Sequence, residues 1–142
     1  AQSADYRCAY CQISERIVGP LLEIDHIIPQ SKGGSSEESN LTLACPLCNG
    51  HKSKRTEAID PQTGYTTPLF NPRQEYWSDH FTWNDGGAII EGKTAIGRAT
   101  VLALDLNHPD VVAGGGYGHR WVGIPRPFDL APLSAAPSIP HR

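Results

Sequence analysis

The sequence has no methionine, few charged residues and no long apolar run. No stretch reaches the roughly 18–20 apolar residues that a transmembrane helix needs, and no apolar signal segment opens the chain. We therefore expect a cytoplasmic protein without a membrane partner. Charged residues make up 19% of the 142 residues and the net charge is −3. No global positive field therefore draws the protein to nucleic acid, and any DNA-binding surface must be local.

Aromatic residues are also few, at 8%, whereas glycine and proline are frequent, with 14 and 12 residues. A chain of this length is expected to form one domain with a small core and many turns. A bound metal would help to stabilise so small a core.

The cysteines form two Cys-x-x-Cys pairs, Cys8/Cys11 and Cys45/Cys48. Each pair can supply two thiolates to a tetrahedral zinc ion. The alternatives are two disulfides or a redox motif. The lack of a secretory signal disfavours disulfides, and a thioredoxin-like site needs one such motif near a βαβ unit. The pattern therefore favours a structural zinc site.

Hydrophobic patterning predicts an α+β domain with the order strand, loop, strand, helix over residues 22–54. The first strand spans residues 22–28, and Pro29 ends it because proline lacks the N–H that a ladder needs. We expect a returning strand at residues 41–44 and a helix from about residue 46 to 54 or beyond. Another short strand is expected at residues 13–18.

Alternation along residues 22–28 predicts which side chains share a face of the first strand. Leu22, Ile24 and His26 are expected on one face, and Glu23 and Asp25 on the other.

The second half of the chain is expected to pack over this small unit. The predicted elements are an aromatic hairpin that turns at Gly86–Gly87 and a helix over residues 95–106 that Thr94 caps. We divide the chain into a core at residues 1–60, an extension at 61–112 and a tail at 113–142. The tail is rich in Gly, Pro and Ala and is expected to be disordered.

Several motifs occur in a fixed order between residues 6 and 55: Asp25-His26-Ile27-Ile28-Pro29, Ser31-Lys32-Gly33-Gly34, Asn40-Leu41 and Cys45-x-x-Cys48-Asn49. This order resembles the HNH endonuclease family. The resemblance implies a ββα-metal (His-Me finger) nuclease core, stapled by a zinc ion on Cys8, Cys11, Cys45 and Cys48. Residues 70–73, 77–81 and 97–100 also resemble a bacterial subgroup of the family.

The resemblance further implies a catalytic role for each motif. His26 would be the general base that activates water, and Asp25 and Asn49 would hold a catalytic Mg²⁺ or Mn²⁺ ion. Asn40 would hold the His26 loop through hydrogen bonds to the backbone. The chemistry agrees, since histidine titrates near neutral pH and carboxylate and amide oxygens suit hard cations.

His51 is an alternative to Asn49 as the last cation ligand. Residues on a helix advance by about 100° each, so His51 lies about 200° from Asn49 and the two cannot easily face one metal. Family members place this ligand directly after the second cysteine. We therefore favour Asn49 and treat His51 as a possible phosphate contact.

DNA is the expected partner, and its expected contacts are Lys52, Lys54, Arg55 and His51. Arg73 and Arg98 are weaker candidates for phosphate contacts. A charge run of this size is also typical of an ordinary solvated helix face, and it indicates DNA binding only weakly by itself. The sequence leaves the oligomeric state open.

Simpler explanations exist for each motif taken alone. Asp25 and His26 could be a surface pair, Asn40 a strand cap and Asn49 a helix cap. His80 lies among aromatic residues and is expected to be a packed, hydrogen-bonded histidine. For the whole chain, the alternatives are a non-catalytic zinc-containing module that binds nucleic acid or protein, and a zinc-ribbon partner subunit without a nucleic-acid role.

The tail carries one further hypothesis. Related chains tend to continue beyond residue 109 with an Arg-rich, Leu-Trp segment. The codons of Gly114 to Gly118 permit Arg, Leu and Trp in a shifted frame. Residues from about Gly114 onward would then derive from a frameshift, which sequencing the gene tests.

Overall fold

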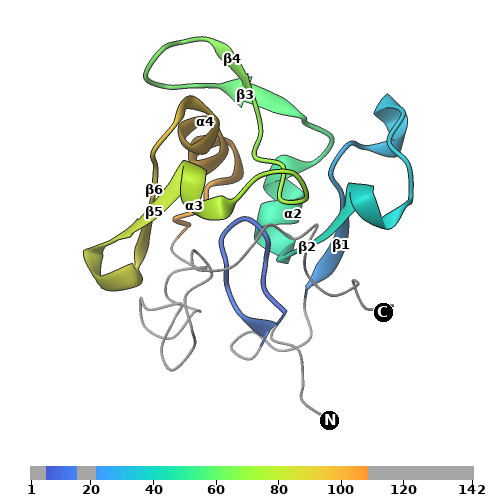
Figure 1. The fold of residues 1–142 in the computed structure, drawn as a ribbon, viewed down its shortest axis with the longest axis horizontal. Helices are drawn as coiled ribbons and strands as arrows, with labels where there is room; N and C mark the ends of the chain where they lie inside the picture. The colour runs from blue at the N-terminus through green and yellow to red at the C-terminus, as the bar shows by residue number, and fades with distance from the viewer. Residues whose placement is uncertain (1–5, 16–21, 109–142) are drawn as a thin grey trace.

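A computed structural model describes residues 6–15 and 22–108. The tail from residue 113, with its expected disorder and frameshift, lies outside the described residues, as does the second half of the strand expected at 13–18. In the described part of that strand, Ser14 forms an isolated bridge with Arg7. The described residues form a mixed α+β domain in which each sheet is a two-stranded antiparallel hairpin, as Figure 1 shows. None of the helices in these two ranges is long and apolar enough to cross a membrane.

The first hairpin pairs β1 (Glu23–His26) with β2 (Leu41–Ala44), and α2 (Pro46–Lys52) follows directly. This is the expected order of strand, strand and helix. Two short 3₁₀ turns, Gln30–Lys32 and Glu38–Asn40, lie within the connection between the strands. Pro46 occupies the first turn of α2, where its missing N–H costs no hydrogen bond.

Burial along β1 does not follow its apolar residues. Asp25 is 4% exposed, whereas Ile24 is 39% exposed. The apolar side chain therefore lies at the surface and the carboxylate lies inside. A carboxylate tolerates burial only when it has partners, and Asp25 has two, which are described below.

A second hairpin, β3 (Glu57–Ile59) with β4 (Thr66–Pro68), was not expected from the sequence. Its strands have only three residues each, too few to show a clear alternation. The turn carried the available signal: Asp60 accepts hydrogen bonds from the Gln62 N–H and the Thr63 hydroxyl. Gly64 closes the turn with a φ of 78°, a conformation that favours glycine.

The aromatic hairpin is present as β5 (Phe81–Asn84) and β6 (Ile89–Gly92), preceded by α3 (Trp77–His80). The last helix, α4 (Ala95–Leu104), begins at the expected cap, where Thr94 Oγ1 accepts from the Gly97 N–H. It ends two residues earlier than expected, because Asp105 takes a left-handed conformation.

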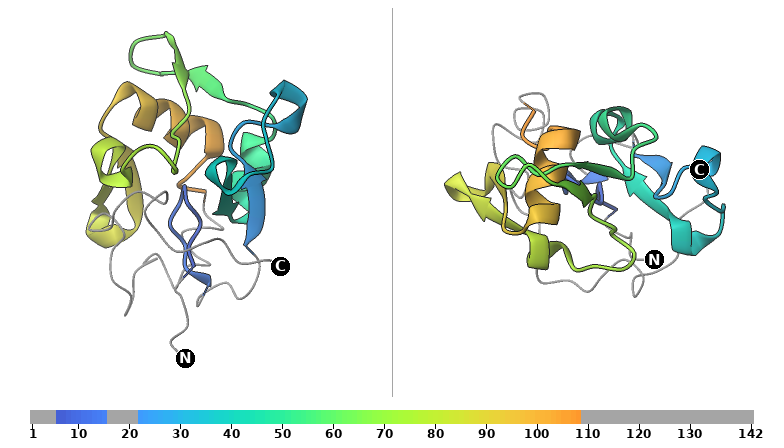
Figure 2. Two further views of the ribbon diagram at one scale, coloured as in Figure 1. Left: turned by 45° about the vertical axis from the view of Figure 1, so that its right-hand side comes forward. Right: turned by 90° about the horizontal axis from the view of Figure 1, so that it is seen from above.

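The core joins both halves of the chain. In Figures 1 and 2 the loop of residues 6–15 lies between the β1–β2–α2 unit and the β5–β6 hairpin. The Trp77 indole N–H donates to the Tyr10 carbonyl at 3.0 Å, and Ala9 N–H donates to the Leu43 carbonyl at 2.8 Å. The loop of residues 6–15, which carries Cys8 and Cys11, is therefore held from both sides.

Two arginines that the sequence suggested as phosphate contacts serve the fold. Arg98 forms a two-point ion pair with Asp60, with both N–O distances at 2.9 Å, and this contact holds the pKa of Asp60 below its usual range. Arg73 is buried and donates to the Leu41 carbonyl. His80 contacts Thr94 and Glu75, as expected for a packed histidine.

Candidate functional site

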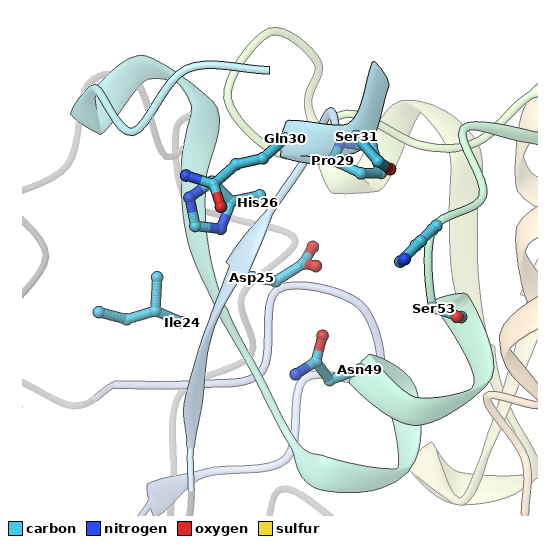
Figure 3. A pocket seen from close by; sticks show the side chains of 9 residues that line it. Ile24, Asp25, His26, Pro29, Gln30, Ser31, Asn49 and Ser53 are labelled. Atoms are coloured by element: carbon cyan, nitrogen blue, oxygen red, sulfur yellow. The ribbon is translucent and has the colours of Figure 1, made fainter. Parts of the chain in front are cut away.

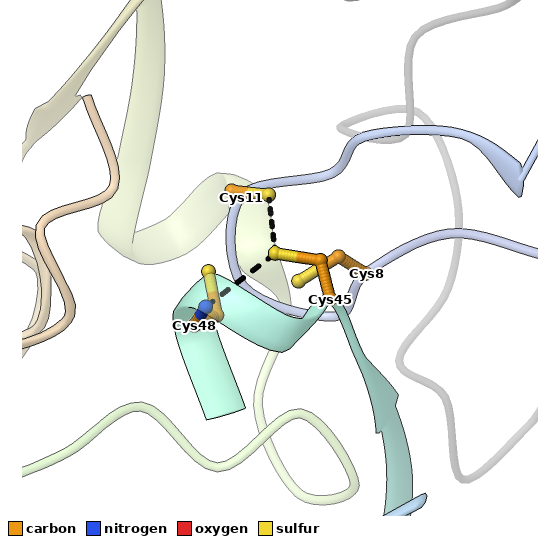
Figure 4. A group of neighbouring side chains, drawn as sticks. All are labelled: Cys8, Cys11, Cys45 and Cys48. Carbon is orange, nitrogen blue, oxygen red and sulfur yellow. Dashed lines mark hydrogen bonds between the residues drawn. The ribbon is translucent and has the colours of Figure 1, made fainter. Parts of the chain in front are cut away.

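The four cysteines converge at one buried point. Their sulfur atoms all lie within 4.8 Å of one another, and all four cysteines are free, so the alternative of two disulfides is not what the structure shows (Figure 4). A tetrahedral zinc ion with Zn–S bonds of about 2.3 Å would place its sulfur ligands about 3.8 Å apart. The Cys11 and Cys45 sulfurs are 3.7 Å apart. The buried four-cysteine cluster could therefore hold a zinc ion.

Local structure explains how the two pairs reach each other. Cys8 and Cys11 lie on a tight turn, in which the Gln12 N–H donates to the Cys8 carbonyl and Gln12 takes a φ of 70°. Cys45 is the N-cap of α2, and its sulfur accepts from the Cys48 N–H at 3.4 Å. The second pair therefore also begins the helix.

Cys45 and Cys11 differ in how readily they lose a proton. Hydrogen bonds, the largest from Cys11, lower the pKa of Cys45 far below the usual thiol range, while burial raises the pKa of Cys11. Without a cation, the cluster cannot hold several thiolates together. A bound cation would release the remaining thiol protons.

A separate, polar pocket of about 350 Å³ lies beside β1 and the C-terminal end of α2. Asp25, His26, Asn49 and Lys54, four of the residues predicted to form the site, line it together (Figure 3). The other residues that line it are Ile24, Pro29, Gln30, Ser31 and Ser53.

Asp25 forms the buried side of this pocket. Its Oδ2 accepts from the Tyr10 hydroxyl at 2.8 Å, and both of its oxygens lie 3.3–3.4 Å from the Lys52 ammonium. Burial raises the pKa of Asp25, and the charge of Lys52 and the Tyr10 hydrogen bond oppose this rise. These two partners explain why a carboxylate can occupy the inner face of β1.

Lys52 does not have the surface position expected of a DNA contact. Its side chain is 1% exposed, and its ammonium also donates to the His26 and Ile27 carbonyls at 3.2 and 3.0 Å. A buried ammonium with these partners is not available to a phosphate. The prediction of Lys52 as a nucleic-acid contact is therefore wrong for this structure.

His26 ends β1, and its ring extends from the side of the strand opposite Asp25 in Figure 3. Its Nε2 lies 3.1 Å from the Ser36 hydroxyl oxygen, which also accepts from the Gln30 side chain. The ring is half-buried and remains part of the pocket lining.

Asn40 holds the chain that follows His26. Its Oδ1 accepts from the Ile28 N–H, and its Nδ2 donates to the carbonyls of Ile28 and Ser35, all at 2.7–2.9 Å. Gly34 makes this arrangement possible, because a Cβ at residue 34 would overlap the Ile28 carbonyl. One side chain thus ties both ends of the loop together.

Asn49 and His51 lie on different sides of α2. The Asn49 Nδ2 donates to Glu23 Oε1 at 2.8 Å, and its carboxamide oxygen points towards Asp25 in Figure 3. His51 bonds to the Leu47 carbonyl at 2.7 Å, and its ring lies near His108. His51 is absent from the residues that line the pocket.

The remaining basic residues differ in their surroundings. Lys54 is exposed and lines the pocket. The Arg55 guanidinium donates to the carbonyls of His51 and Ala103 at 2.6 and 2.7 Å. Arg55 therefore links α2 to the end of α4, and Lys54 is the exposed cation in the pocket lining.

Sequence reasoning did not identify Tyr10, Glu23 or the internal role of Lys52. Tyr10 had one visible signal, its position between the cysteines of the first pair. Lys52 had none, because its neighbours Lys54 and Arg55 make it look like part of an exposed charge run.

Comparison with known proteins gives a family match. Residues 8–55 match the family model described as HNH endonuclease. Neither a curated protein nor a solved structure matches the chain. The matched residues include both cysteine pairs and the pocket residues Asp25, His26, Asn49 and Lys54.

Proposed function

We propose, from the match of residues 8–55 to the HNH endonuclease family and from the buried four-cysteine cluster, that the protein is a metal-dependent endonuclease that hydrolyses DNA phosphodiester bonds. In this proposal β1, β2 and α2 are the ββα-metal unit of the family. The observation that carries the proposal is the shared pocket of Asp25, His26 and Asn49. A carboxylate, an imidazole and an amide line this pocket, from the end of one strand and from one helix.

Asp25 and Asn49 would hold a catalytic Mg²⁺ or Mn²⁺ ion. Carboxylate and amide oxygens are ligands that such hard cations prefer. Because the Asn49 Nδ2 donates to Glu23, the Asn49 carboxamide oxygen points towards Asp25. When bound, the cation would neutralise charge that develops on the phosphate and on the departing 3′-oxygen.

His26 is proposed as the general base. In the tautomer that donates Nε2–H to Ser36 Oγ, the Nδ1 lone pair is left to accept a proton from the attacking water. The hydrogen bonds of Asn40 fix the loop that follows His26 and carries Ser36. Asn40 would therefore support the base without touching the substrate.

A zinc ion on the four cysteines would hold the fold, since the site is closed and all its protein ligands are sulfur. DNA would approach across the pocket mouth, where Lys54 is exposed.

Plasmid nicking in Mg²⁺ or Mn²⁺ tests the proposal. His26→Ala should lower the nicking rate by about 10²–10⁴-fold, the usual contribution of a general base. His108→Ala, which changes a histidine outside the pocket lining, is the matched control and should cut like the wild type.

Equal cutting by the wild type and His26→Ala would show that His26 is not the base. DNA binding without nicking in either cation would instead support the alternative, a non-catalytic zinc-containing module.

A further inference from the structure

Tyr10 connects the four-cysteine cluster to the proposed cation site. It lies between Cys8 and Cys11 in the chain, and its side chain is completely buried. Its hydroxyl donates to Asp25 Oδ2 at 2.8 Å, the shortest polar contact that this carboxylate makes among the described residues. A residue of the loop that carries Cys8 and Cys11 therefore contacts Asp25, a proposed ligand of the catalytic cation.

The backbone of Tyr10 is fixed on both sides. The Trp77 indole donates to its carbonyl at 3.0 Å, and the neighbouring Ala9 N–H donates to the Leu43 carbonyl in β2 at 2.8 Å. The cysteines at positions 8 and 11 would be anchored by zinc. The phenol therefore reaches Asp25 from a support that cannot easily move.

The Tyr10 hydroxyl is the closer of the two polar partners that Asp25 Oδ2 has among the described residues. Without it, the Lys52 ammonium, at a longer distance of 3.3 Å, would be the remaining one of these two. A tyrosine hydroxyl is a hydrogen-bond donor, and this one donates to the Asp25 carboxylate.

We propose that Tyr10 is a positioning residue through which the four-cysteine site sets the orientation of Asp25, and thereby the cation affinity of the pocket. This inference rests on the proposed function, in which Asp25 is a cation ligand. Partners behind a metal ligand commonly change metal affinity by about 10–100-fold.

Tyr10→Phe is the direct test, because it removes the hydroxyl and keeps the ring. Mn²⁺ binding to the zinc-loaded full chain is measured by the loss of the free Mn²⁺ signal in electron paramagnetic resonance. We expect the Mn²⁺ Kd to rise about tenfold, with zinc content unchanged. Nicking should need correspondingly more Mn²⁺ and should approach the wild-type rate at saturating Mn²⁺.

Thr100→Val is the matched control. It also removes a completely buried hydroxyl, one that bonds to Phe70 and Ile96 in the α4 region. It should reproduce the loss of stability caused by a missing buried hydrogen bond and leave the Mn²⁺ Kd unchanged. An equal rise of Kd in Thr100→Val would overturn the inference, as would loss of zinc from Tyr10→Phe, because the effect would then act through folding.

Asp25→Asn separates the two levels of the proposal. If the wild type and Asp25→Asn bind Mn²⁺ equally, or if neither binds it, the proposed cation site is refuted and the inference with it. Weaker binding by Asp25→Asn together with wild-type binding by Tyr10→Phe would refute the inference alone. Weaker binding by both variants supports both.

Discussion

The four-cysteine cluster and the Asp25 pocket are neighbours with opposite designs. The first is closed, and all four of its cysteines are buried. The second is a pocket whose proposed catalytic groups offer oxygen and nitrogen atoms. Of these groups only Asp25 is buried. Closed four-ligand sites are typical of structural metals, whereas catalytic sites keep a position for substrate or water.

The two sites nevertheless share one helix. Cys48 and the adjacent Asn49 both belong to α2. A metal ion that holds Cys48 in place would therefore also hold the backbone of Asn49, from which its amide side chain extends. The difference between the sites shows a division of roles: a closed site can supply rigidity, and an open site beside it can use that rigidity. The predictions below try to separate these two roles.

The largest effect is expected from the closed site. Cys45→Ser removes a proposed zinc ligand and changes the N-cap of α2. Structural zinc contributes about 10–16 kcal/mol of apparent binding free energy, comparable with the whole stability of a small domain. We expect loss of cooperative thermal unfolding in circular dichroism and loss of zinc in metal analysis.

The open site should behave differently in the same assay. Washing out Mg²⁺ or Mn²⁺ while zinc is retained should stop nicking and leave the unfolding curve almost unchanged. Cooperative unfolding of zinc-free Cys45→Ser at the wild-type temperature would break the distinction between the two sites.

A smaller effect is expected from the partner of Asp25. Lys52→Met leaves a buried carboxylate without its cation, which typically costs about 3–5 kcal/mol. Urea denaturation measures this loss. Lys32→Met, at an exposed lysine, is the control and should stay within about 0.5 kcal/mol of the wild type. A wild-type midpoint for Lys52→Met would show that the internal ion pair contributes nothing.

The smallest effect is expected at the mouth of the pocket. Lys54→Ala should weaken DNA binding a few-fold and reduce the slope of log K against log salt by about one, because one phosphate contact is lost. Fluorescence anisotropy at several salt concentrations measures both. Lys93→Ala, whose ammonium instead bonds to the Ser78 carbonyl, should leave the slope unchanged. An unchanged slope in Lys54→Ala would place the DNA elsewhere.

Much of the fold near the cysteines was predictable because the local signals agree. Cys-x-x-Cys spacing imposes its own geometry, so the convergence of both pairs followed from the sequence. The β1–β2 hairpin, the aromatic hairpin and the Thr94 cap were predictable for the same reason. Each depends on residues that are close together in the chain.

The burial of Asp25 and Lys52 was not predictable from the same signals. Alternation assigns apolar side chains to the inner face and cannot detect a partner far away in sequence. Asp25 is buried because Tyr10 and Lys52, 15 and 27 residues away, meet it in the fold. Local patterns cannot show such pairings, and they decide the electrostatics of the pocket.

The hydrogen bond from Trp77 to the Tyr10 carbonyl has a consequence for any attempt to transplant this domain. Trp77 lies outside residues 8–55, the part that the family model matches. A graft limited to that part would leave the carbonyl without its donor and the loop that bears Tyr10 without its cover. The portable unit is therefore larger than its motif, and a host scaffold would have to supply an aromatic N–H donor at the same place.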